Sequence, residues 1–167
     1  MATIYAKADV SLPNDTDVVV KRSFRAPREL VWRAHTEPSL VQRWMLGPPG
    51  WSMPVCEMDL REGGTYRWRW RSDESGKEFG FFGEFTNVEA PAALAFSEFY
   101  DPGDVGGDMG NGADVSYDFV AHDGVTTMNT RMRFKSKAER DAAVSTGMTD
   151  GMEMGYQRLD KIAAEQC

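Results

Sequence analysis

The segment 147–164, near the carboxyl end, is the feature that most constrains how this chain can fold. Apolar residues recur in it at intervals of three and four positions, and polar residues fall mostly between them. This spacing predicts one amphipathic helix of about four to five turns, roughly 25 Å long. Because strand-like segments come before it, we expect the helix to lay its apolar stripe on a sheet.

The first half of this predicted helix is poorly suited to close packing. Its apolar stripe begins with Met148 and Met152, and methionine fills irregular space loosely. Gly151 and Gly155 lie in the same half, and each costs about 1 kcal/mol relative to alanine in a helix interior. These residues indicate that the first half of the helix covers a cavity.

The preceding segments predict a curved antiparallel sheet. The segment 17–25 is rich in β-branched residues, which is typical of a strand, and Pro27 and Pro38 then each open a short helix. Period-two alternation and glycine-containing turns predict six more strands, at 53–61, 66–71, 77–88, 93–100, 113–121 and 125–134. Short connections favour a meander of about seven strands wrapped on the terminal helix, which is an α+β helix-grip fold.

Composition restricts the classes of protein to which the chain can belong. Its 167 residues suffice for one domain, which we place at 16–167 after an N-terminal leader over 1–15. A net charge of −7 argues against binding to nucleic acid or to anionic membranes. No apolar run approaches the roughly 20 residues that span a bilayer, and we expect no secretory signal. With only Cys56 and Cys167, a reduced, cytoplasmic protein is expected.

Several short motifs follow one another in an order that is similar to one known family. They are Ala-Pro-Arg-Glu-Leu-Val-Trp at 26–32, Trp44 with Gly47 and Pro48, Asp-Leu-Arg-Glu-Gly-Gly at 59–64, Phe-Gly-Glu-Phe at 82–85 with Val-Glu-Ala-Pro at 88–91, and Gly-Met-Thr-Asp-Gly at 147–151 after Phe134, Ser136, Arg140 and Asp141. Over residues 18–164 the chain resembles the homologues of the activator of the heat-shock-protein-90 ATPase, within the START-like, SRPBCC superfamily. Two segments depart from the pattern: Met45 and Leu46 stand where an aromatic residue is common, and loop 101–112 is longer, more acidic and richer in glycine.

This resemblance implies a helix-grip fold with a cavity between the sheet and the terminal helix. It does not imply one activity, since relatives include binders of lipids and other hydrophobic ligands, cyclases and co-chaperones. No cofactor motif stands out in the sequence, so we expect no cofactor and no metal.

Large side chains that face inward by strand parity or helix spacing are the candidate lining of this cavity. Small-molecule pockets are usually apolar with a few polar groups. The candidate ligand-binding residues are Trp44, Trp68, Trp70, Phe79, Phe81, Phe96, Glu98, Tyr117, Phe119, Met128, Met132, Met148, Met152 and Tyr156. The alternative interpretation is that these side chains only pack against one another.

Glu98 is the main polar candidate. It shares strand parity with Phe96, so an inward Phe96 implies an inward Glu98. A carboxyl group there would have a raised pKa or a cationic partner, and it could orient a polar ligand. Glu98 and Tyr117 are also weak candidates for a general acid or base. In the alternative, the parity breaks at the strand end and Glu98 is solvated.

The remaining charged and titratable residues have simpler explanations. His122 is expected to be exposed at a hairpin turn, and His35 to be a cation at a helix end; neither has nucleophile or metal spacing. The acidic loop 101–112 lacks the spacing of an EF-hand and favours a flexible cover of the cavity mouth or a solvated loop. The arginines at 67, 69 and 71 alternate with aromatic residues and are expected to pair with acidic residues across strands, although an anionic protein partner is an alternative.

Three functional hypotheses follow from these observations. The leading one is that the chain binds a small hydrophobic or amphipathic molecule without turnover. The second is a cavity enzyme of cyclase or hydrolase type that uses Glu98 or Tyr117. The third is a chaperone-interacting module, which ranks last because the chain has no room for the second domain of the eukaryotic co-chaperone. A homodimer is left open.

Overall fold

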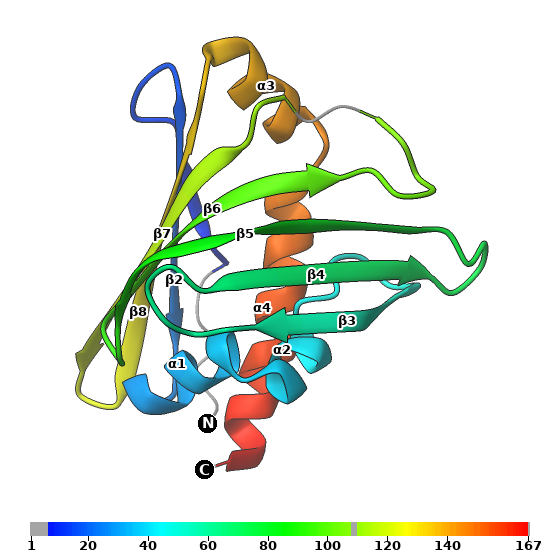
Figure 1. The fold of residues 1–167 in the computed structure, drawn as a ribbon. Coiled ribbons are helices and arrows are strands. Elements are labelled where there is room, and N and C mark those ends of the chain that lie inside the picture. Colours follow the sequence, from blue (N-terminus) through cyan, green and yellow to red (C-terminus); the bar gives the residue numbers. More distant parts are fainter. Residues whose placement is uncertain (1–6, 108–109, 167) are drawn as a thin grey trace.

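A curved antiparallel sheet wraps around the terminal helix of this protein (Figure 1). The computed structural model describes residues 7–107 and 110–166, and within them eight strands form one sheet in the order β1-β2-β8-β7-β6-β5-β4-β3. The elements are β1 (Asp9–Ser11), β2 (Asp17–Phe24), α1 (Arg28–Thr36), α2 (Pro38–Trp44), β3 (Trp51–Met58), β4 (Thr65–Ser72), β5 (Glu78–Glu89), β6 (Ala93–Asp101), β7 (Ala113–His122), β8 (Val125–Phe134), α3 (Lys137–Ser145) and α4 (Met148–Gln166). The helix-grip fold expected from the sequence is confirmed.

Strand β1 comes from the segment that was expected to be an N-terminal leader. It has three residues and pairs antiparallel with β2, from Asp9 opposite Lys21 to Ser11 opposite Val19. Such a short edge strand shows no detectable periodicity in the sequence. It adds an eighth strand to the seven that the sequence predicts.

Local turn and capping signals explain where the elements begin and end. In the β7–β8 hairpin, Asp123 and Gly124 have φ values of 50° and 78°, the positive values that a type I′ turn requires at both central positions. Ser136 caps the start of α3, since the Glu139 backbone N–H donates to Ser136 Oγ at 3.1 Å. Gly147, with φ 81°, then separates α3 from α4.

The two faces of β4 show how strand alternation organises the sheet. Tyr66, Trp68 and Trp70 are 2, 4 and 9 % exposed and face the core. Arg69 faces outward, and its guanidinium donates to Glu78 at 3.0 Å and to Asp101 at 2.7 Å. For Arg69, the cross-strand pairing with acidic residues that the sequence predicts is confirmed.

Arg22 on β2 fixes α4 against the sheet. Its side chain is only 2 % exposed, and its guanidinium pairs with Glu153 at 3.1 Å and with Asp160 at 2.8 Å. The two acids are seven residues apart, or about two helical turns, so one arginine holds two points on the same helix face. Leu159 and Ile162, which are 2 and 3 % exposed, pack the same half of α4 into the core.

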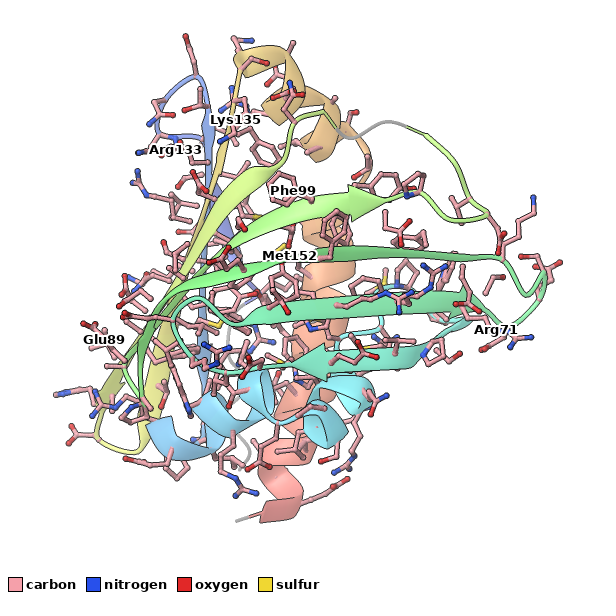
Figure 2. All side chains as sticks on the ribbon, viewed as in Figure 1. Arg71, Glu89, Phe99, Arg133, Lys135 and Met152 are labelled. Atoms are coloured by element: carbon pink, nitrogen blue, oxygen red, sulfur yellow. The ribbon has the colours of Figure 1, made fainter. Side chains whose placement is uncertain are left out.

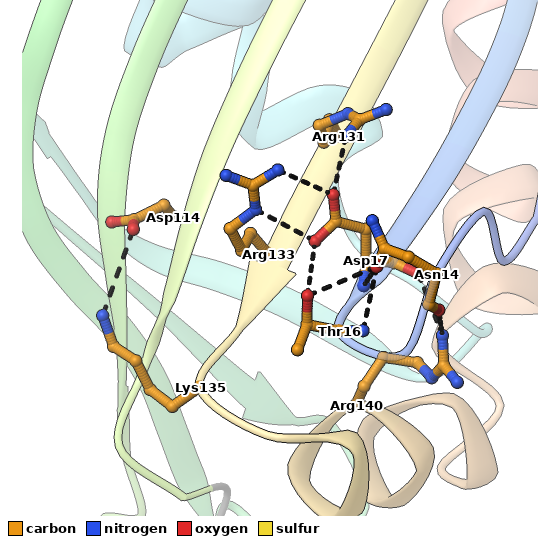
Figure 3. Close-up of polar contacts among 8 residues, drawn as sticks. All are labelled: Asn14, Thr16, Asp17, Asp114, Arg131, Arg133, Lys135 and Arg140. Atoms are coloured by element: carbon orange, nitrogen blue, oxygen red, sulfur yellow. Dashed lines mark hydrogen bonds and ion pairs between the residues drawn. The ribbon is translucent and has the colours of Figure 1, made fainter.

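A second polar cluster ties α3 to the outer side of β2 and β8 (Figure 3). The buried Asp17 carboxylate accepts hydrogen bonds from Arg131 at 2.6 Å and from Arg133 at 3.1 Å. From α3, the Arg140 guanidinium donates to the backbone oxygens of Asn14 and Asp17 at 2.7 and 3.1 Å. The sheet, α3 and α4 are thus held together by polar contacts that lie outside the space described next.

Candidate functional site

A pocket of about 500 Å³ lies between the inner face of the sheet and the first turns of α4. Its volume falls within the range of about 300–1,000 Å³ that is usual for small-molecule sites. Side chains from both sides of the fold reach it, including Trp68 and Phe81 from the sheet and Met148 and Met152 from α4. Figure 2 shows Met152 on α4, behind the front strands of the sheet.

The structure places most of the candidate ligand-binding residues on the wall of this pocket. These are Trp44, Trp68, Trp70, Phe79, Phe81, Glu98, Tyr117, Met132, Met148, Met152 and Tyr156. Phe96, Phe119 and Met128 also face inward, but they are 1, 2 and 1 % exposed and belong to the solid core. Helix α1 closes that end of the sheet, as the contact between the rings of Trp32 and Phe119 shows, with centroids 5.9 Å apart. These three residues are therefore removed from the set that lines the pocket.

Aromatic rings that contact one another form a large part of the pocket wall. Trp70 stacks on Phe79 with ring centroids 5.5 Å apart, and Trp51 meets Phe79 edge-on at 5.2 Å. The Trp70 indole N–H donates to the Met45 backbone oxygen at 2.6 Å, which ties the segment after α2 to the sheet. The wall at this end is consequently held in place by ring packing and by a hydrogen bond to the backbone.

The two glycines of α4 have different environments. A Cβ at position 155 would lie 3.1 Å from the Trp44 backbone oxygen and 3.3 Å from its ring, so glycine here permits close approach of α2. A Cβ at position 151 would meet Pro48 at 3.7 Å, an ordinary contact. Both glycines line the pocket, but only Gly155 is required by packing.

Glu98 on β6 reaches the pocket with an unpaired carboxyl group. It is half-buried and lines the pocket, so the inward alternative is the one observed. Burial raises the pKa of the Glu98 carboxyl from 4.5 to about 7. Among the described residues, no side chain donates a hydrogen bond to this carboxyl or forms an ion pair with it. Tyr66 and Tyr117 are close enough for its charge to raise the pKa of their hydroxyls further, beyond the larger effect of burial.

His35 differs from the sequence-based expectation. Instead of a cation at a helix end, it is a buried neutral imidazole, 2 % exposed, whose pKa burial lowers to about 4. Its Nδ1–H donates to the Val31 backbone oxygen at 2.8 Å, and its ring packs against Trp44 and Tyr117 at 4.8 and 5.4 Å. The expectation was wrong because α2 and the sheet cover this end of α1. The usable signal was its position four residues after the buried Val31.

Other lining residues were not among the candidate ligand-binding residues. They are His35, Met45, Leu46, Gly47, Pro48, Trp51, Tyr100, Val105, Gly112, Ala113, Val115, Thr130, Phe134, Ala143, Thr146, Gly147, Gly151 and Gly155. Tyr100 could have been found, since it shares strand parity with Glu98. The segment 45–48 has no periodicity that fixes which way its residues face, and the only signal there was the departure of Met45 and Leu46 from the family pattern.

The acidic loop reaches the pocket at a few described positions. Val105 and Gly112 line it, and the Tyr100 hydroxyl donates to the Gly106 backbone oxygen at 2.6 Å. Residues 108–109 lie outside the described part of the chain. The expectation that this loop covers the mouth of the cavity stays a prediction.

His122 is exposed as expected, with 88 % of its side chain accessible.

These features define a helix-grip protein with an apolar pocket beneath its terminal helix. A family model described as "Activator of Hsp90 ATPase homolog 1-like protein" matches residues 25–164, and the chain belongs to this family. Members of this family typically bind hydrophobic ligands. Among the described helices, none is long and apolar enough to cross a membrane.

Solved structures of bacterial proteins share this fold. A crystal structure from Rhodobacter sphaeroides is 27% identical, covers 96% of this chain and 99% of its own, and has a TM-score of 0.87. A crystal structure from Mycobacterium smegmatis is 22% identical, with coverage of 94% and 96% and a TM-score of 0.82. A solution structure of an AHSA1-like protein from Aeromonas hydrophila is 20% identical, with coverage of 86% and 93% and a TM-score of 0.68. A comparison with curated proteins found no match.

Proposed function

We propose that this protein binds a small hydrophobic or amphipathic molecule in the pocket between the sheet and α4. The observation that carries the proposal is the pocket of about 500 Å³ with a wall of aromatic and methionine side chains. Burial of apolar ligand surface against such a wall supplies about 25 cal/mol per Å². The pocket-facing Met148 and Met152 can adapt to ligands of different outline, because methionine is flexible.

Equilibrium binding of N-phenyl-1-naphthylamine, a neutral probe that fluoresces in apolar surroundings, tests the proposal. We expect saturable binding to the wild type and at least about tenfold weaker binding to Met152→Trp, because the indole fills the pocket. Met154→Trp is the matched control: it places the same indole on the same helix, where the native side chain is 40% exposed. Equal binding to all three proteins would contradict the proposal, as would the absence of binding to the wild type. Unfolding of Met152→Trp would mean that the site is packed core.

A second candidate function is favoured by the raised pKa of Glu98. A carboxyl group with a pKa of about 7 is suited to act as a general acid or base near neutral pH. The proposal is limited to proton transfer to or from a ligand bound in the pocket that Glu98 lines. Glu98→Gln should then abolish turnover of a bound substrate while the N-phenyl-1-naphthylamine affinity stays within about twofold.

Three expectations from the sequence stay predictions. They are the cytoplasmic location, a homodimer, and the third hypothesis of interaction with a chaperone. The lipid class of ligand is likewise untested, and the polar groups of the pocket bear on it directly.

A further inference from the structure

The charges around the pocket limit which ligands it can hold. Among the described residues that line it, Glu98 is the one with an acidic side chain, and none is lysine or arginine. The nearest histidine, His35, carries its proton on Nδ1 and turns a lone pair on Nε2 toward its surroundings, where it has no partner in the described chain. The wall therefore offers a carboxyl group, a neutral imidazole, the indole N–H of Trp68, which is unpartnered among the described residues, and the hydroxyls of Thr130 and Tyr117, but no cation.

An anionic head group would be poorly placed in this wall. A carboxylate or phosphate loses its hydration on entry and needs a cation or several donors to replace it. Here it would find uncharged donors such as the Trp68 N–H but no cation, and the Glu98 carboxylate would repel it. By contrast, an O–H or N–H group would find an acceptor in Glu98, which no described side chain occupies.

The aromatic rings of the wall also favour ligands without a negative charge. Rings such as Trp68, Trp70 and Tyr117 present electron-rich faces, which attract aromatic edges and cations. Tyr117 lies between the two polar groups, since its ring is 5.4 Å from His35 and its hydroxyl is affected by the charge of Glu98. The polar part of the wall is thus one small region within an aromatic pocket.

We propose that the pocket takes an aromatic molecule with an O–H or N–H donor and no negative charge, with Glu98 as the acceptor for that donor. This inference rests on the proposed function, that the pocket binds a small molecule. It assigns the ligand to phenols and arylalkyl amines, and it excludes fatty acids and phospholipids.

Four naphthalene derivatives of similar size test this assignment by displacement of N-phenyl-1-naphthylamine. They are 2-methylnaphthalene, 2-naphthol, 2-naphthylmethylamine and 2-naphthoate. We expect 2-naphthol and the amine to bind at least about fivefold more tightly than 2-methylnaphthalene, and 2-naphthoate at least about tenfold more weakly than 2-naphthol. In Glu98→Gln the preference for the amine should disappear. Glu84→Gln, which removes an exposed acid from β5, should leave all four affinities unchanged.

A pH series on the wild type gives a second measurement that needs no variant. Tyr66 from β4 and Tyr117 from β7 are close enough for the charge of Glu98 to affect them, and Tyr156 from α4 and His35 from α1 line the same pocket. The three tyrosines have raised pKa values and His35 a lowered one, so all four stay neutral between pH 6 and 8. Glu98 ionises in this interval, and the amine, which stays protonated, should bind several-fold more tightly at pH 8.

The outcomes separate this inference from the proposed function. If 2-methylnaphthalene binds but 2-naphthoate binds as tightly as 2-naphthol, the assignment of the ligand is overturned and the apolar pocket stands. If neither N-phenyl-1-naphthylamine nor any naphthalene binds, the proposed function itself fails. An amine preference that survives in Glu98→Gln and does not change with pH would also overturn the role of Glu98.

Discussion

Asp17 and Glu98 are carboxyl side chains on one sheet, but the regions around them are built in opposite ways. Asp17 accepts hydrogen bonds from Arg131, Arg133 and Thr16, and the Arg133 bonds contribute most to lowering its pKa to about 2 (Figure 3). Glu98 faces the pocket without such partners, and burial raises its pKa to about 7. The Asp17 carboxylate is satisfied by partners within the protein, whereas the Glu98 carboxyl faces the pocket with no side-chain partner among the described residues.

The largest effect is expected from a change in the scaffold. Arg22→Met leaves Glu153, whose side chain is 12% exposed, without its cationic partner. Because an uncompensated buried charge is costly, we expect the free energy of unfolding to fall by about 3–5 kcal/mol in urea titrations. Arg43→Met is the control, because it breaks an exposed pair between α2 and Glu165 on α4. This change should cost less than about 1 kcal/mol. Equal losses in the two variants would show that Arg22 is not a special anchor of α4.

Asp17→Asn should destabilise the protein by a smaller amount. Because the pKa of Asp17 is lower in the folded state than in the unfolded state, its carboxylate stabilises the fold above pH 4, and this contribution is lost as the pH falls toward 2. The shift corresponds to about 2 kcal/mol at pH 7. Denaturant titrations at pH 7 and pH 2.5 should show most of this loss only at the higher pH. A loss that is the same at both pH values would rule out the charge as its cause.

Glu98→Gln should change the stability in the opposite direction from Asp17→Asn. The pKa of Glu98 is higher in the folded state, so its ionisation opposes folding, and wild-type stability should decline between pH 4.5 and 7. At pH 8 we expect the variant to be more stable by about 1–2 kcal/mol, less than the full shift implies because Glu98 keeps some solvent contact. At pH 4 the two proteins should be alike. Destabilisation at pH 8 would mean that Glu98 has a stabilising partner.

The smallest effect concerns the two glycines of α4. Gly151→Ala should raise the free energy of unfolding by about 0.5–1 kcal/mol, because a Cβ there meets only an ordinary contact at 3.7 Å. Gly155→Ala should give no gain, since its Cβ would lie 3.1 Å from the Trp44 backbone oxygen. Thermal unfolding of the pair measures the difference. A clear gain at position 155 would show that α2 can move away.

Strand parity and helix spacing predicted which faces are buried. They did not predict which inward residues of a strand line the pocket and which belong to the solid core. Tyr66, Trp68 and Trp70 were correctly assigned to one face because their period is two. The same rule assigned both Phe96 and Trp70 to the inward face, although only Trp70 of the two lines the pocket. The difference arises because the rings of Tyr66, Trp68, Phe85 and Tyr117 surround Phe96, and no local pattern in the sequence predicts those contacts.

Residues whose role depends on distant elements were the ones that sequence reasoning missed. His35 is neutral because α2 and β7 bury it, and glycine is needed at 155 because Trp44 packs against it. The unpaired state of Glu98 is also a tertiary property, since parity gave its direction but not its neighbours. Fold class was predictable from repeating patterns, while the chemistry of the pocket required the structure.

The most direct test of the central claim is to locate a bound ligand by NMR of methyl-¹³C-methionine protein during titration with N-phenyl-1-naphthylamine. The pocket wall contains Met45, Met132, Met148 and Met152, whereas Met53, Met58 and Met154 lie elsewhere. Ring currents from the ligand should shift the first four methyl signals and leave the other three in place. Shifts confined to the other three, or no shifts at saturating ligand, would contradict binding in this pocket.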